Sequence, residues 1–213
     1  MSAPTIRGFA AAIAAGNPVL AKAHPLHPET TRLLAREALG AALDAGLPAA
    51  TVQLIYDLEY ADGERLVQDP RLAAVAFTGS KRGGLALKRA ADAAGTPIYL
   101  ELGSVNPVAV LPGALSERGG EIATELAGSC LMGTGQFCTN PGLVLLEQGA
   151  DADAFVVALT EAFEAAPNGT LFSAAGREGL AAQVNALRSA GAEVLAGGEP
   201  VEGTAACYAN TVL

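Results

Sequence analysis

The chain has 213 residues, of which 51% are hydrophobic and 5% aromatic, and this composition is typical of a folded globular protein rather than a disordered one. Its 13 Lys and Arg against 22 Asp and Glu give a net charge of −9, so we expect no nucleic-acid partner, because phosphate binding needs a basic face. Three cysteines without a CxxC pair argue against a disulfide framework and a zinc site, and the lack of a long apolar run predicts no membrane span. Residues 9–15 loosely imitate a signal peptide, but alanine dominates them, so we expect a reduced, cytoplasmic protein.

Strands and helices alternate through the first half of the chain. Short apolar runs bounded by Gly and Pro indicate strands, and apolar residues spaced three and four apart indicate helices, with Gly46 at one C-terminal cap. The pattern predicts strands over residues 18–22, 51–56, 73–77 and 97–101 and helices over residues 29–45, 63–68 and 81–94. This alternation predicts an α/β fold with a doubly wound, parallel, Rossmann-like sheet.

The order of predicted elements changes after Pro107, and we expect a boundary to a second α/β domain between Leu102 and Pro107. Pro112-Gly113 reads as a turn. Beyond it, the pattern predicts helices over residues 116–131, 151–165 and 176–190 and strands over residues 142–147 and 192–195. We therefore expect two partial domains, residues 1–104 and residues 105–213. Residues 208–213 resemble an unfinished strand rather than a solvated tail, so we expect both ends of the chain to be cut.

A polar turn follows the third predicted strand, in the sequence Phe77-Thr-Gly-Ser-Lys-Arg-Gly-Gly84. Backbone N–H groups and the helix dipole converge at such a turn, so Gly79 and Ser80 are candidates for binding a phosphate. The same residues fit a purely structural role, in which Gly79 turns the chain and Ser80 caps the helix. The local pattern leaves both interpretations open.

Lys22 ends the first predicted strand, at the edge where open parallel sheets bind ligands. Taken alone, Lys22 favours the plainer interpretation, a solvated lysine at a strand end. His24 and His27 flank prolines and have no Cys, Asp or Glu at metal-ligand spacing, so we predict no metal site.

Two cysteines lie in different sequence surroundings. Cys130 falls on a predicted helix beside Leu126 and Leu131, which is typical of an inert buried thiol. Cys138 follows the glycine-rich run Gly133-Thr-Gly-Gln-Phe, and polar residues and glycines surround it. We therefore predict that Cys138 is an accessible thiol whose thiolate form can act as a nucleophile.

Glu101 ends the last strand of the first domain, between apolar residues in Tyr99-Leu-Glu-Leu-Gly103. A carboxylate in such surroundings is costly unless it is paired, solvated or functional. Apolar surroundings also raise the pKa of a glutamate, which suits a general base acting through water. A structural salt bridge is the alternative.

Four motifs occur in a specific order along the chain. They are a PVxxK strand ending at Lys22, Phe77-Thr-Gly-Ser80, Glu101-Leu-Gly103 and Gly135-Gln-Phe-Cys138. Together they closely resemble the aldehyde dehydrogenase superfamily from about Ala10 onward, as a central fragment. The sequences Gly103-Ser-Val-Asn-Pro107 and Lys22-Ala-His-Pro-Leu-His-Pro28 are similar to the branch that oxidises 2-oxoglutarate semialdehyde, also called 2,5-dioxopentanoate.

The resemblance implies a reaction on a small-molecule aldehyde. Cys138 attacks the aldehyde, and the resulting thiohemiacetal passes a hydride to a nicotinamide cofactor. Glu101 then activates the water that hydrolyses the thioester. The resemblance also implies a homo-oligomer in the complete family form.

The same resemblance implies a cofactor site in the first domain. Lys22 would hold the adenosine ribose, and Gly79 and Ser80 the pyrophosphate. Leu102 would contact the nicotinamide edge through its backbone. Many NAD-preferring members have a glutamate three residues after the lysine, where it repels a 2′-phosphate, and here that position is Pro25. We therefore expect NADP or NAD as the cofactor, with the 2′-phosphate tolerated.

Two departures from the family pattern bear on activity. The opening residues do not supply the asparagine that completes the family's oxyanion hole, which leaves the Cys138 N–H as the recognisable donor. In residues 56–63, only Gly63 remains of the glycines that let the backbone approach the cofactor, and Glu59 and Asp62 add negative charge near a dianionic ligand. Two function classes therefore stay open: an NAD(P)-dependent aldehyde dehydrogenase, and a catalytically inactive nucleotide-binding remnant of that family.

Overall fold

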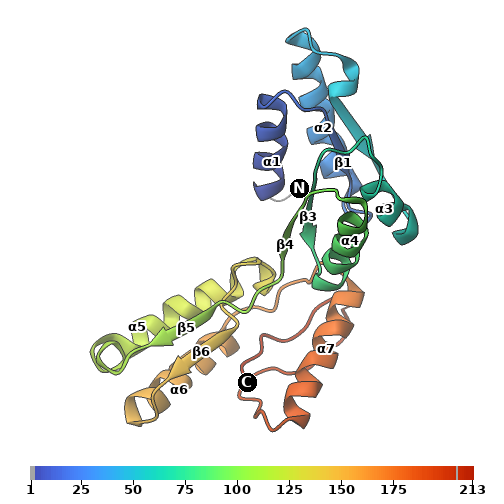
Figure 1. Cartoon of the computed structure of the whole chain (residues 1–213). Helices are drawn as coiled ribbons and strands as arrows, with labels where there is room; N and C mark the ends of the chain where they lie inside the picture. Colours follow the sequence, from blue (N-terminus) through green and yellow to red (C-terminus); the bar gives the residue numbers. More distant parts are fainter. Residues whose placement is uncertain (1–2, 205) are drawn as a thin grey trace. The chain divides into compact units, whose positions relative to one another are not determined.

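The computed structural model describes residues 3–204 and 206–213, in two compact units, Met1–Gly103 and Ser104–Leu213. The first unit alternates helices and strands (Figure 1). Its elements are α1 (Ala3–Ala14), β1 (Val19–Lys22), α2 (Pro28–Asp44), the short 3₁₀ turn η1 (Ala49–Thr51), β2 (Val52–Ile55), α3 (Tyr60–Val67), β3 (Val75–Gly79), α4 (Lys81–Ala94) and β4 (Ile98–Leu102).

The strands of this unit pair in parallel, β1 with β2 and β3 with β4. The predicted α/β class with parallel strands is confirmed, and the two pairs form separate two-stranded sheets among the described residues. A small core lies where α3 and α4 meet the β3–β4 pair; its buried members are Val67, Ala90 and Ala91.

Element bounds in the first unit follow the sequence pattern closely, with three differences. Strand β3 begins and ends two residues later than expected, so it includes Gly79. Helix α3 begins at Tyr60 instead of Gly63, because Gly63 continues the helix and donates its N–H to the Glu59 carbonyl at 3.0 Å. Helix α1 is not predicted from the sequence, because alanine favours helices without giving the apolar periodicity by which a helix is recognised.

The second unit packs two helices on one strand pair (Figure 1). Its elements are β5 (Pro107–Val110), α5 (Pro112–Leu131), the 3₁₀ turn η2 (Met132–Gly135), β6 (Leu143–Leu146), α6 (Ala150–Ala165) and α7 (Ala174–Ser189). Strands β5 and β6 are parallel, and their inward residues Val110 and Leu146 pack on α5 and α6. Phe155 is the largest side chain at the centre of this core and is 1% exposed.

Two sequence predictions in the second unit are wrong, and its first helix has an interruption that the sequence does not predict. Pro112-Gly113 is not a turn but the first turn of α5, where proline is tolerated because its missing N–H has no helical partner. The helix is interrupted at Arg118, whose φ of −149° and ψ of 32° are not helical. Residues 192–195 are not a strand; Leu195 instead donates to the Val212 carbonyl at 2.9 Å, beside an isolated antiparallel bridge between Ala196 and Val212.

Within residues 3–204 and 206–213, no helix is both long and apolar enough to cross a lipid bilayer.

Candidate active site

At the end of β3, the structural interpretation holds for Ser80 but not for Gly79, which is the last residue of the strand rather than part of a turn. Ser80 caps α4, because its Oγ accepts a hydrogen bond from the Gly83 N–H at 3.2 Å. The Phe77 ring folds back over Gly79, where a Cβ would lie 2.8 Å from the ring. Lys81 and Arg82 are exposed in the first turn of α4, so positive charge flanks the helix N-terminus. Capping by Ser80 and binding of an anion at this turn are compatible, and the phosphate role stays a prediction.

The register of β3 and β4 brings this turn next to two other predicted residues. Gly79 lies opposite Leu102 and Thr78 lies opposite Glu101, so all four belong to the carboxyl end of one strand pair. Leu102 turns inward, against Gly84 of α4. Glu101 faces outward and is exposed, as is its neighbour Tyr99 at 68%. The apolar surroundings expected for Glu101 are therefore wrong, because strand alternation places its apolar neighbours on the opposite face.

Lys22 is exposed at the carboxyl end of β1, opposite Ile55 of β2. Its positive charge acts on the following loop: burial lowers the pKa of His24, and the charges of Lys22 and His27 lower it further. Lys22 therefore supplies a cation at the carboxyl end of a parallel strand, and its role at a cofactor stays a prediction.

Helix α3 carries the acidic residues that the sequence places near the cofactor. Asp62 is paired with Arg65 at 3.0 Å, so its negative charge is partly offset. Gly63 lies inside the helix, and a Cβ added there would have no atom of another part of the chain within 4 Å of it. Gly63 therefore has no packing role in the structure, and its role at a cofactor stays a prediction.

Cys138 is exposed on the loop between η2 and β6. Its backbone carbonyl accepts two side-chain hydrogen bonds, one from the Ser104 hydroxyl and one from Asn106 Nδ2, the latter at 2.9 Å. Asn106 Nδ2 also donates to the Asn140 carbonyl at 3.0 Å, two residues beyond the cysteine. The segment just before β5 thus holds the backbone on the carboxyl side of Cys138.

Gln136 holds the other side of the same loop. Its Oε1 accepts from the Phe172 N–H at 2.7 Å, and its Nε2 donates to the Gly133 carbonyl at 3.3 Å. Asn140 Oδ1 is buried and has no hydrogen-bond partner among the described residues. Leaving such an atom unpaired costs about 1–3 kcal/mol.

The other two cysteines lie in more enclosed surroundings. Cys130, near the end of α5, is half-buried, and its thiol lies 3.5 Å from the Pro141 carbonyl. Burial raises the pKa of the Cys130 thiol. Cys207 is half-buried with its sulfur 3.7 Å from Thr170 Oγ1.

The sequence pattern does not identify Ser104, Asn106 and Gln136 as site residues. Their partners lie more than thirty positions away along the chain, so a local pattern carries no sign of these contacts. The only sequence signal is their place in the motifs around Gly103 and Cys138, which the family resemblance already singles out.

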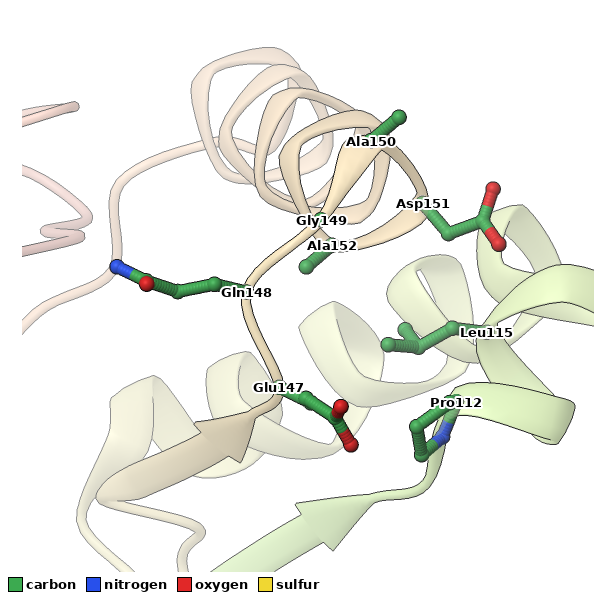
Figure 2. Close-up of a pocket in the computed structure, with 8 residues that line it drawn as sticks. All are labelled: Pro112, Leu115, Glu147, Gln148, Gly149, Ala150, Asp151 and Ala152. Carbon is green, nitrogen blue, oxygen red and sulfur yellow. The ribbon is translucent and has the colours of Figure 1, made fainter.

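A separate hollow lies at the start of α6 (Figure 2). It is lined by Pro112, Leu115, Glu147, Gln148, Gly149, Ala150, Asp151 and Ala152. None of the predicted site residues lines it, and the carboxylates of Glu147 and Asp151 disfavour a dianionic cofactor there. In the described part of the chain, no three His, Cys, Asp or Glu side chains gather as a metal ion would need.

Comparison with known proteins identifies relatives of this chain. The chain is 43% identical over 166 residues to Alpha-ketoglutaric semialdehyde dehydrogenase 2 of Azospirillum brasilense, a match that covers 77% of this chain and 32% of that protein. It is 42% identical over 153 residues to Alpha-ketoglutaric semialdehyde dehydrogenase of Acinetobacter baylyi, covering 71% of this chain and 29% of that protein. The chain thus spans about a third of the length of these relatives.

Solved structures agree with this match. Succinic semialdehyde dehydrogenase from Streptococcus pyogenes, in complex with NADP+, superposes with a TM-score of 0.81 at 25% identity, over 97% of this chain and 46% of that one. An NAD-dependent aldehyde dehydrogenase from Sinorhizobium meliloti gives a TM-score of 0.81 at 28% identity, over 95% of this chain and 41% of that one. The model of the aldehyde dehydrogenase family matches residues 3–213. The chain belongs to the aldehyde dehydrogenase family.

Proposed function

We propose that this chain carries the nucleophile of an NAD(P)-dependent aldehyde dehydrogenase whose substrate is a semialdehyde such as 2,5-dioxopentanoate. The observation that carries the proposal is Cys138, an exposed thiol on a loop whose backbone is held by Ser104 and Asn106. The substrate class is supported by two relatives above 40% identity that are named for 2-oxoglutarate semialdehyde.

The chemistry begins at Cys138. Its thiolate sulfur bonds to the aldehyde carbon, the C=O π pair moves to oxygen, and the oxygen takes up a proton to give a thiohemiacetal. The Cys138 N–H is the donor proposed to stabilise the developing oxyanion. Loss of hydride from the thiohemiacetal carbon, together with loss of the hydroxyl proton to solvent, leaves a thioester. Glu101 acts as the base that takes a proton from the water attacking this thioester, and the carbon–sulfur bond then breaks to release the carboxylate and restore the Cys138 thiolate.

The first unit has groups suited to a dinucleotide. The exposed N-terminal turn of α4, with Ser80, Lys81 and Arg82, suits the pyrophosphate, and Gly79 shapes that turn. Lys22 is proposed for the adenosine ribose and the backbone of Leu102 for the nicotinamide edge. NAD or NADP, when bound, would accept the hydride.

The 2′-phosphate of NADP is proposed to be tolerated. Pro25 brings no carboxylate to the ribose, and Lys22 adds a positive charge beside it. The solved NADP+ complex of the Streptococcus pyogenes relative supports this choice of cofactor.

The test is reduction of NADP or NAD by the purified chain, followed by absorbance, with 2,5-dioxopentanoate or propionaldehyde as substrate. We expect reduction that is faster with 2,5-dioxopentanoate, abolished by Cys138→Ala and retained by the matched Cys130→Ala variant. Lys22→Ala should weaken NADP more than NAD. If calorimetry shows cofactor binding but no aldehyde is oxidised, the chain is the inactive nucleotide-binding form; equal rates in the native chain and Cys138→Ala would refute the nucleophile.

A further inference from the structure

The carbonyl of Cys138 lies in a polar clamp formed by the side chains of Ser104 and Asn106. Asn106 Nδ2 reaches two carbonyl oxygens of the same loop, that of Cys138 at 2.9 Å and that of Asn140 at 3.0 Å. The Ser104 hydroxyl donates to the Cys138 carbonyl as well. Both lone pairs of that carbonyl are therefore engaged by side chains.

Asn106 also has an unusual backbone. Its φ of 50° is one of two positive values among the described non-glycine residues, the other being Thr134 in the same region. Asn and Asp adopt this conformation more readily than other side chains do, because they are short and polar. Asn106 therefore holds this left-handed backbone at the position from which its amide contacts the Cys138 loop.

We infer that Asn106, assisted by Ser104, is a positioning residue that fixes the Cys138–Thr139 peptide and so the direction from which the Cys138 thiol meets an aldehyde. The inference rests on the proposed nucleophile. With the loop already ordered, forming the carbon–sulfur bond costs less conformational entropy. The inference requires the side-chain N–H of Asn106 as a donor, and it does not depend on the size of the side chain or on the backbone angle of the residue.

Asn106→Asp tests the donor directly. Aspartate has the same shape and tolerates the same positive φ, but its carboxylate cannot donate to the two carbonyls. Ser104→Ala and Ser104→Thr form a second pair, in which threonine keeps the hydroxyl. Each variant of the full chain is alkylated with iodoacetamide at rising propionaldehyde concentration, and labelling of each cysteine peptide is followed by mass spectrometry.

Two quantities separate positioning from accessibility. The alkylation rate at Cys138 without aldehyde reports access, and the aldehyde concentration that halves this rate reports adduct formation. In Asn106→Asp we expect the half-protecting concentration to rise at least about fivefold, because two hydrogen bonds to the loop are lost, while the rate without aldehyde stays within about twofold. Ser104→Ala should shift the same quantity in the same direction, and Ser104→Thr should restore it.

Protection that is the same in native chain, Asn106→Asp and Ser104→Ala would overturn the inference and leave Cys138 as the nucleophile. A native Cys138 that aldehyde does not protect would remove the nucleophile and the inference with it. Cys130 monitors folding in every variant, because unfolding exposes it to rapid labelling. If Asn106→Asp unfolds, the Ser104→Ala and Ser104→Thr pair decides the question.

Discussion

The three cysteines differ in exposure, and this difference predicts the order in which they react. Cys138 is exposed, whereas Cys130 is half-buried with a pKa raised by burial, so less of Cys130 is thiolate at neutral pH. We expect iodoacetamide at pH 7 to label Cys138 at least about tenfold faster than Cys130. Labelling of Cys130 should accelerate as pH rises toward its pKa. Mass spectrometry of the digested chain measures both rates, and faster labelling of Cys130 or Cys207 would exclude Cys138 as the reactive thiol.

His24 reports on the charge that Lys22 brings to the end of β1. Burial lowers the pKa of His24 below its ordinary value of 6.5, and the charges of Lys22 and His27 lower it further. An NMR titration of His24 should therefore find a midpoint below 6.5. His24 binds a proton less readily in the folded chain than in the unfolded chain. The stability that neutral His24 contributes is therefore lost as pH falls below about 6.5. Lys22→Ala should raise the pKa of His24, whereas Lys88→Ala, whose ammonium pairs with Asp92 on α4, should leave it unchanged. An unchanged midpoint in Lys22→Ala would mean that Lys22 does not face this loop.

Single residues also show where sequence reasoning succeeds and fails. The cap at Ser80 follows from its place between an apolar run and a helix, a purely local signal. The contact from Asn106 to the Cys138 carbonyl joins segments 32 positions apart, and no local pattern reports such a contact. Glu101 was expected among apolar side chains because its sequence neighbours are apolar, but a strand turns those neighbours to the other face.

Among the elements, α4 shows how close packing restricts a glycine. A Cβ at Gly84 would collide with the Leu102 side chain and lie 3.3 Å from the Phe77 ring, and Gly84 is buried. We therefore expect Gly84→Ala to lower the free energy of unfolding by roughly 1–3 kcal/mol, measured by chemical denaturation.

Gly40 is the matched control for that substitution. It is exposed inside α2, and a Cβ there would meet nothing within 4 Å. Gly40→Ala should raise stability by roughly 0.5–1 kcal/mol, because alanine favours a helix over glycine. A Gly84→Ala variant as stable as Gly40→Ala would contradict the packing of α4 on β4.

Elements bounded by clear sequence signals could be predicted from the sequence, and elements without such signals could not. Helix α2 and strand β1 lie within one residue of their expected bounds, since apolar spacing and flanking Gly and Pro mark both. Strand β5 is four residues long and begins with proline, a residue that usually interrupts a strand. Its pairing with β6 could therefore not be predicted and is seen only in the structure.

At the scale of the whole molecule, the two units differ in core size. Among the residues whose burial is described, the core cluster of the first unit has three buried members and that of the second has nine. Because burial of apolar area is the main stabilising contribution, we expect amides in α5 and α6 to exchange with deuterium at least about tenfold more slowly than those in α4. Hydrogen exchange followed by mass spectrometry measures this, with α7 as a surface helix for reference. Slower exchange in α4 would show that cluster size does not set the order.

The two units are also consecutive along the chain, since one ends at Gly103 and the other begins at Ser104. During translation, both strand pairs of the first unit have therefore been synthesised before any residue of the second. Strand β5 is made next, but its partner β6 begins only at Leu143, which corresponds to a few seconds of synthesis at about 5–20 residues per second. For that interval the nascent chain presents β5 without its pairing partner, and this is the stage at which a ribosome-associated chaperone would have an apolar segment to shield.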